Sequence, residues 1–130
     1  MSAEENRRLI EGVYAAFGRW DLPAMFEAFD ENIFFHIPGR GPLTGDYRGR
    51  QELLGFFQRF MPLSGGTFRV KVEELLAGDR RVLVLVTESA ERNGRNWSSP
   101  QVHAWTIEGG KATVFWQFQG DQQSEDAFWS

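Results

Sequence analysis

Apolar residues recur every three or four positions in three segments of the first half of the chain, which is the spacing of one face of an α-helix. The first segment begins after Ser2, which has the spacing of a helix-capping box, and continues to about Gly18. The second is short and starts at Asp21, a good N-cap residue. The third covers 50–61 and is stopped by Pro62. We therefore predict three helices in this half.

The strand pattern begins between the second and third predicted helices. A β-branched and aromatic run at 33–37 predicts one strand, and a Gly- and Pro-rich segment predicts a loop reaching about Arg48. From Phe68 onward the apolar period changes to two, as on a strand with one wet face. The segment 82–86 is apolar at every position, which predicts a central strand covered on both faces.

Two turns divide the last part of the chain into hairpins. Asn93-Gly94 is a strong hairpin turn, and Gly109-Gly110 joins the predicted strands 97–107 and 111–119. Helices followed by hairpin strands predict an α+β domain, with the helices on one face of an antiparallel sheet. We expect one domain over residues 1–130.

Composition narrows the function classes. The chain has 130 residues, 42% of them hydrophobic and 15% aromatic, so rings are available for a core, a pocket or an interface. It has no cysteine, which excludes disulfide and thiolate chemistry. A net charge of -4 argues against nucleic acid as a partner. With no apolar run of membrane-spanning length, we expect a cytoplasmic protein that does not enter a membrane.

Short motifs in the same order as the predicted elements resemble those of SnoaL-like proteins, in the nuclear transport factor 2 superfamily. The motifs are Ala15-Ala16-Phe17, Asp21-Leu22, His36-Ile37-Pro38-Gly39, Gly45-Asp46-Tyr47-Arg48-Gly49, Val102-His103-Ala104-Trp105 and Trp116-Gln117-Phe118. The resemblance spans nearly the whole chain. It implies a cone-shaped fold in which three N-terminal helices pack on a curved antiparallel sheet around an apolar cavity. Homodimers are common in the family, and its activities include polyketide cyclisation, ketosteroid isomerisation, epoxide hydrolysis and plain binding.

The resemblance also suggests site residues. The positions that carry ketosteroid isomerase chemistry fall on Val13, Ile37 and Val102, which cannot perform it, so steroid isomerase activity is not expected. SnoaL-type cyclases place a Gln, a His and a carboxylate near the cavity, and Gln101 and His103 match the first two.

The cyclase carboxylate position falls nearest Gln117, a neutral amide, and Asp121 is the substitute that we consider. We therefore take His103 and Asp121 as candidate proton carriers. The candidate ligand-binding residues come from the helices, the first loop and the last two strands: Tyr14, His36, Tyr47, Phe57, Gln101, Trp116 and Gln117. The chain has only two histidines, far apart and outside any metal-ligand spacing, so we expect neither a metal nor a cofactor.

The residue pattern does not decide which face of the sheet lines the cavity. Pairing through the Gly-Gly turn places His103 on one face together with Trp116, and Gln117 on the other, but a one-residue slip would exchange the faces.

One functional hypothesis is an acid-base enzyme acting on an apolar carbonyl or epoxide compound. The other is a non-catalytic small-molecule-binding or dimeric scaffold protein, pairing through its open sheet face as a homodimer. A protein-interaction module is a third reading. The apolar tail, Phe128-Trp129, either closes the cavity or packs on a partner chain.

Overall fold

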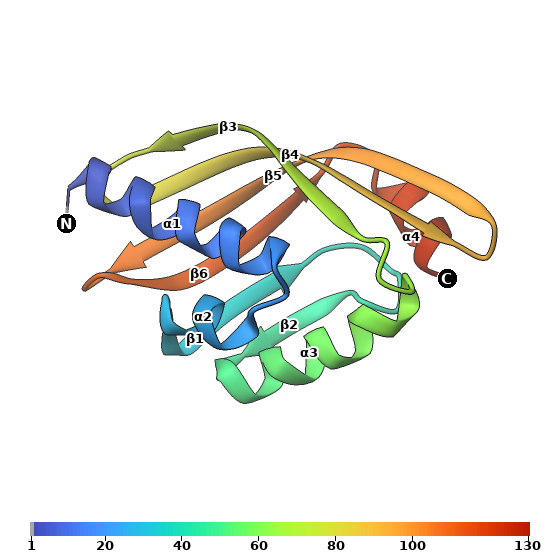
Figure 1. The fold of residues 1–130 in the computed structure, drawn as a ribbon, viewed down its shortest axis with the longest axis horizontal. Coiled ribbons are helices and arrows are strands. Elements are labelled where there is room, and N and C mark those ends of the chain that lie inside the picture. The colour runs from blue at the N-terminus through green and yellow to red at the C-terminus, as the bar shows by residue number, and fades with distance from the viewer. Residues whose placement is uncertain (1) are drawn as a thin grey trace.

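A curved six-stranded sheet runs the length of the molecule in the computed structural model, which describes residues 2–130 (Figure 1). The strand order is β2-β1-β6-β5-β4-β3, and neighbours are antiparallel except for the parallel pair β1 and β6. The strands are β1 (Phe29–Ile37), β2 (Gly45–Arg48), β3 (Arg69–Ala77), β4 (Arg81–Arg92), β5 (Arg95–Glu108) and β6 (Lys111–Gln119). The helices are α1 (Ala3–Gly18), α2 (Leu22–Glu27), α3 (Gly49–Leu63) and α4 (Gln122–Trp129). The predicted α+β class is confirmed, with one parallel strand pair.

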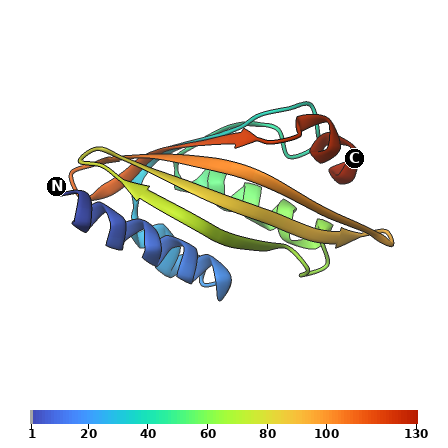
Figure 2. The same cartoon turned by 90° about the horizontal axis from the view of Figure 1, so that it is seen from above.

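The three predicted helices form, and α1 and α2 begin at the predicted capping residues. Ser2 and Glu5 make both bonds of the capping box of α1. The side chain of Asp21 accepts a hydrogen bond from the Ala24 backbone N–H at the start of α2. Pro62 lies in the last turn of α3, which ends one residue later. These helices cover the concave side of the sheet, with α1 against β3 and β4, and α3 against β1 and β2 (Figure 2).

Both predicted hairpin turns are confirmed by backbone geometry. Asn93 and Gly94 have φ angles of 53° and 74°, and Gly109 and Gly110 have 57° and 79°. Two consecutive residues at positive φ are typical of the type I′ turn, whose twist matches that of the flanking strands. The long antiparallel ladder from β4 through β6 is therefore specified by local turn chemistry.

Two elements differ from the sequence prediction. The segment expected to be a loop as far as Arg48 contains the short edge strand β2, which pairs with β1. The apolar tail forms a helix of its own, α4, at the end of the sheet far from the N-terminus (Figure 1). Both elements are short, and both are held by packing on longer elements rather than by the local preference of their own residues.

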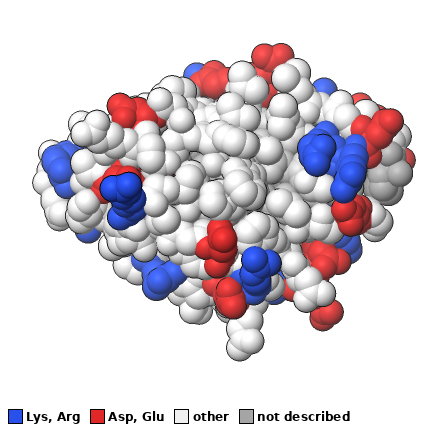
Figure 3. Space-filling view, turned by 180° about the vertical axis from the view of Figure 1, so that it is seen from behind, with Lys and Arg blue, Asp and Glu red and all other residues white. Residues whose placement is uncertain are grey.

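One face of the sheet is buried and the other is open. Val82, Val84 and Val86 of β4 are fully buried beneath the helices, whereas Leu83 on the opposite face is 38% exposed. The prediction that 82–86 is covered on both faces is therefore wrong for the single chain, because helices lie on one side only. The open face is largely free of charged side chains at its centre, with charges gathered around the edge (Figure 3).

A β-bulge decides which residues share a face on β5 and β6. The register shifts between Thr106 and Ile107, so His103 lies opposite Gln117 and Trp105 lies opposite Phe115. The uninterrupted pairing expected from the Gly-Gly turn placed Gln117 and Phe115 on the other face from His103, and this prediction is wrong by the one residue that the bulge inserts. His103 and Gln117 thus both face the helices.

Candidate functional site

A cavity of about 90 Å³ lies between the helices and the concave face of the sheet. Its wall is mostly aromatic, with phenylalanines from α1, α3, β1, β6 and the segment just before β3, and with Trp105 and Trp129. A few polar side chains interrupt this wall: Tyr14, Glu88, His103, Gln117 and Glu125. An apolar enclosure with a few converging polar groups is typical of a small-molecule site.

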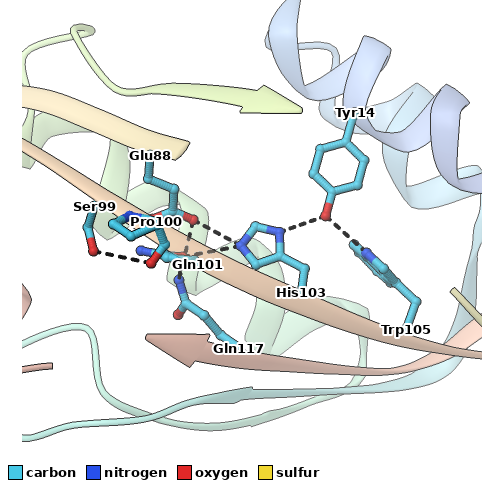
Figure 4. A network of polar contacts seen from close by, with 8 residues as sticks. All are labelled: Tyr14, Glu88, Ser99, Pro100, Gln101, His103, Trp105 and Gln117. Carbon is cyan, nitrogen blue, oxygen red and sulfur yellow. Dashed lines mark hydrogen bonds and ion pairs between the residues drawn. The ribbon is translucent and has the colours of Figure 1, made fainter. Parts of the chain in front are cut away.

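His103 is the centre of the polar network in this cavity (Figure 4). It projects from β5, is only 4% exposed, and has a partner at each ring nitrogen. The Tyr14 hydroxyl from α1 lies 2.6 Å from its Nδ1, and the Glu88 carboxylate from β4 lies 3.0 Å from its Nε2. Three elements distant in the sequence thus contribute one connected chain of polar groups.

The direction of these hydrogen bonds follows from the donors at one end. The Trp105 indole N–H can only donate, and it donates to the Tyr14 hydroxyl oxygen at 3.1 Å. Burial raises the pKa of Tyr14 above its usual range, so the phenol keeps its proton and donates it to His103 Nδ1. With Nδ1 as the acceptor, the imidazole carries its proton on Nε2 and donates it to Glu88.

Two amides hold the other end of the network. The Gln117 Nε2 donates to Glu88 Oε2 at 3.3 Å and to Gln101 Oε1 at 2.5 Å. Gln101 Oε1 also lies 3.3 Å from His103 Nε2. The Glu88 carboxylate therefore accepts from two buried side chains, which orient it within a low-polarity enclosure.

A second carboxyl group lines the same cavity from α4. Glu125 is 8% exposed, and burial, with the negative charges of Glu88 and Asp126, raises its pKa to about 8. Glu125 is therefore largely protonated at neutral pH, whereas Glu88 accepts hydrogen bonds from His103 and Gln117. Two acids in one cavity with opposite roles are a common arrangement in acid-base sites.

Five of the nine candidate residues meet at this cavity. Tyr14, Phe57, His103 and Gln117 line it, and Gln101 bonds to two of these from the same sheet face. The cyclase-like reading, which placed His103 inside, agrees with this geometry. Their suggested roles in binding and proton transfer remain predictions.

Asp121 does not reach the cavity. It is exposed at the N-cap of α4, where its carboxylate accepts a hydrogen bond from the Ser124 backbone N–H at 3.1 Å. The structure therefore does not support the expectation that Asp121 carries a proton in the cavity, because an unpredicted helix begins at this position and uses the carboxylate as its cap.

Three further candidates lie away from the cavity. His36 and Trp116 stack on each other on the open sheet face, with ring centroids 3.9 Å apart, and His36 Nδ1 lies 2.7 Å from Asp46. Tyr47 is buried, but its hydroxyl donates to the Leu43 carbonyl and accepts from Arg59, outside the cavity lining. The expectation that these residues contact a ligand in the cavity is not supported.

Val102, which aligned with a position of ketosteroid isomerase chemistry, also faces away from the helices, opposite exposed Phe118. That alignment placed the cavity on the wrong face of β5. The other two aligned positions, Val13 and Ile37, do line the cavity, and neither side chain can transfer a proton.

The sequence reasoning missed the two carboxyl groups. Glu88 continues the alternation of 82–86 by two residues, so a longer strand would have placed it on the buried face. Glu125 is three and four positions before Phe128 and Trp129, which is the spacing of one buried helical face. Both signals were present, but each depended on extending an element beyond its most apolar part.

Neither a metal cluster nor a membrane-spanning helix is found in the described part of the chain. Residues 2–130 contain no group of three or more His, Asp or Glu side chains placed to hold a metal ion. None of the helices in this range is long and apolar enough to cross a membrane.

Comparison with known proteins identifies the fold and the family. Bal32a, from a soil-derived mobile gene cassette, superposes with a TM-score of 0.94 and 31% identity over 98% of each chain. An NTF2-like protein from Burkholderia xenovorans LB400 gives a TM-score of 0.85 and 25% identity, covering 100% of this chain and 99% of that one. TerC, co-crystallised with polyporic acid, gives 0.85 and 22%, covering 97% and 99%. The SnoaL-like domain family matches residues 10–115. This chain, with its NTF2-like fold, therefore belongs to the SnoaL-like family.

Proposed function

We propose that this protein binds a small, mostly apolar carbonyl compound in its cavity and moves a proton of that ligand by general acid-base chemistry, without a cofactor. The observation that carries the proposal is the continuous chain from Trp105 through Tyr14 and His103 to Glu88. His103 and Gln117 both donate to the Glu88 carboxylate, so this group is oriented before any ligand enters.

Glu88 is the proton acceptor in this proposal. It takes a proton from the carbon next to the ligand carbonyl, and the electron pair of the broken C–H bond moves to the carbonyl oxygen. His103 donates to Glu88 through Nε2–H and is a positioning residue, as is Tyr14, which holds the imidazole in the required tautomer. Return of the proton from Glu88 to the same or another carbon completes an exchange or an isomerisation.

The size and polarity of the cavity support a ligand that is about as large as a single ring. The volume is about 90 Å³ and the wall is mostly aromatic, which favours a small apolar body with few polar atoms. TerC, which was co-crystallised with polyporic acid, has the same fold, and this supports a small-molecule ligand in the cavity.

Deuterium exchange tests the chemistry directly. The protein is incubated in D₂O with cyclohexanone and related ring ketones, and loss of the proton signal next to the carbonyl is followed by NMR. We expect exchange above the buffer rate for the wild type, and a loss of about a hundredfold or more in Glu88→Gln. Glu91→Gln is the matched control, because Glu91 lies on the same strand with an exposed side chain.

A non-catalytic binding protein is the second candidate, and one observation favours it. Both ring nitrogens of His103 are already bonded within the protein, as in a network that only stabilises a cavity wall. Ligand binding without any exchange over the ketone panel would support this candidate and contradict the catalytic proposal.

We also propose that the open sheet face forms a homodimer interface. Leu83, Trp116 and Phe118 on this face are 38%, 38% and 52% exposed, and the centre of the face is largely free of charged side chains (Figure 3). An apolar patch with a charged rim is typical of a protein interface.

A further inference from the structure

Glu125 presents a hydrogen-bonding group to the cavity that the protein itself does not satisfy. Its side chain is more than nine-tenths buried, and its Oε2 has no hydrogen-bond partner among residues 2–130. Buried polar atoms nearly always have a partner in a folded protein, so an unpaired one that lines a cavity indicates a group supplied by a ligand or water.

The position of Glu125 is set by the packing of α4. Trp129, one helical turn later, also lines the cavity and packs against Phe60 of α3, while Phe128 stacks on Trp97 of β5. These contacts hold the helix across one end of the cavity. They keep the Glu125 carboxyl group inside the cavity. Burying this group has a desolvation cost, which an exposed carboxyl group would not have.

We propose that the carboxyl group of Glu125 is the hydrogen-bond donor that binds the carbonyl oxygen of the ligand, and that the site selects uncharged carbonyl compounds over carboxylates. This inference rests on the proposed function, because it assigns the second polar contact of the same ligand. The ligand lies between Glu88, which receives the proton, and Glu125, which holds the oxygen.

The two carboxyl groups act on opposite ends of the same electron shift. As Glu88 takes the proton from carbon, negative charge develops on the carbonyl oxygen. The O–H of Glu125 makes a stronger hydrogen bond to this charged oxygen than to the oxygen of the neutral ketone. No proton needs to leave Glu125. A ligand carboxylate meets the negative charge of Glu88, and no Lys or Arg from residues 2–130 lines the cavity to compensate.

The surroundings of Glu125 favour the protonated form. Burial raises its pKa to about 8, and the charges of Glu88 and Asp126 act in the same direction. Other titratable or charged groups lie on the elements packed around α4: His103 of β5, Arg92 of β4, whose guanidinium donates to the Phe128 and Ser130 carbonyls, and Arg40, whose backbone N–H donates to Asp126. None of these makes a hydrogen bond to the Glu125 carboxyl group.

Binding of a matched pair of probes tests the inference. Cyclohexanone and methylenecyclohexane have nearly the same shape, but only the ketone has a hydrogen-bond acceptor. Their affinities are measured by tryptophan fluorescence, since Trp105 and Trp129 line the cavity, and by thermal shift. We expect the wild type to prefer the ketone by about tenfold near neutral pH, and to lose this preference as the pH rises through about 8.

Two variants and one control make the result specific. Glu125→Leu should remove the ketone preference at every pH, while Glu125→Gln, which keeps an N–H donor and cannot ionise, should retain the preference and lose its pH dependence. Asp121→Asn changes an acid on the same helix outside the cavity, keeps a capping side chain, and should behave as the wild type.

An unchanged preference in Glu125→Leu would overturn the inference. So would a wild-type preference that does not change across the alkaline range. Failure of the proposed function gives a different result from failure of this inference. In that case the ketone shows no deuterium exchange, but the wild type still prefers the ketone in binding.

Discussion

Replacing Glu125 by Gln should change the pH dependence of folding stability. The pKa of this group in the folded protein is raised from 4.5 to about 8, mainly because burial disfavours the charged form. A raised folded-state pKa means that the stabilising contribution is complete below 4.5 and is lost as the pH rises to about 8. Glutamine is nearly the same size and cannot ionise, so Glu125→Gln removes this loss.

The magnitude follows from the size of the shift. One pH unit corresponds to about 1.4 kcal/mol, so the interval from 4.5 to about 8 sets an upper limit of about 5 kcal/mol. Water entry and local relaxation around α4 reduce such values, and we expect about 2 to 3 kcal/mol. For a chain of this length this free energy corresponds to roughly 10 °C in Tm.

Thermal unfolding of the two proteins at a series of pH values measures this effect. The Tm difference between Glu125→Gln and wild type should be near zero at about pH 5 and should grow to roughly 10 °C at about pH 9. In Asp121→Asn the difference from wild type should stay constant over the same range. A Glu125→Gln difference that does not depend on pH would refute the assignment of a buried, neutral Glu125.

The remaining predictions concern the network, the α4 cap and the open face. Tyr14→Phe leaves the Trp105 N–H and His103 Nδ1 without a partner, so we expect urea denaturation to show a loss of about 1 to 3 kcal/mol in the free energy of unfolding. The deuterium exchange of the ketone ligand should also be slower. Asp121→Ala removes only a helix cap and should lower stability by about 1 kcal/mol with an unchanged exchange rate; a large loss of exchange would restore Asp121 as a proton carrier. Phe118→Lys should convert the proposed dimer to a monomer, measured by light scattering after size exclusion, and a wild type that is already monomeric would contradict the interface.

Local chemistry explains why most of the fold could be predicted. Capping residues at Ser2 and Asp21, the positive-φ turns at Asn93-Gly94 and Gly109-Gly110, and the change of apolar period at Phe68 each act over a few residues. Such interactions depend on neighbours in the chain, so they are visible in the sequence. The family resemblance then supplied the order in which the elements pack.

The candidate site was predicted less completely, for the same reason. His103, Gln117 and Tyr14 could be named as site residues. A longer predicted strand would have placed Glu88 on the buried face, but its contact with His103 exists only when β4 pairs with β5. The residue that took its place in the prediction, Asp121, was chosen by closeness in the sequence, and α4 uses it as a cap.

The sequence by itself determined the types of the longer elements, the two hairpin turns and the aromatic, cysteine-free composition of a small cavity protein, since these depend on residue type and short spacing. Only the tertiary structure decided which sheet face is the cavity and which acids enter it. The bulge between Thr106 and Ile107 shifts β6 by one residue, and alternation along a strand turns that single residue into a change of face for every side chain beyond it. The packing of α4 then brings Glu125 into the cavity, because a short helix takes its position from the surface that it covers.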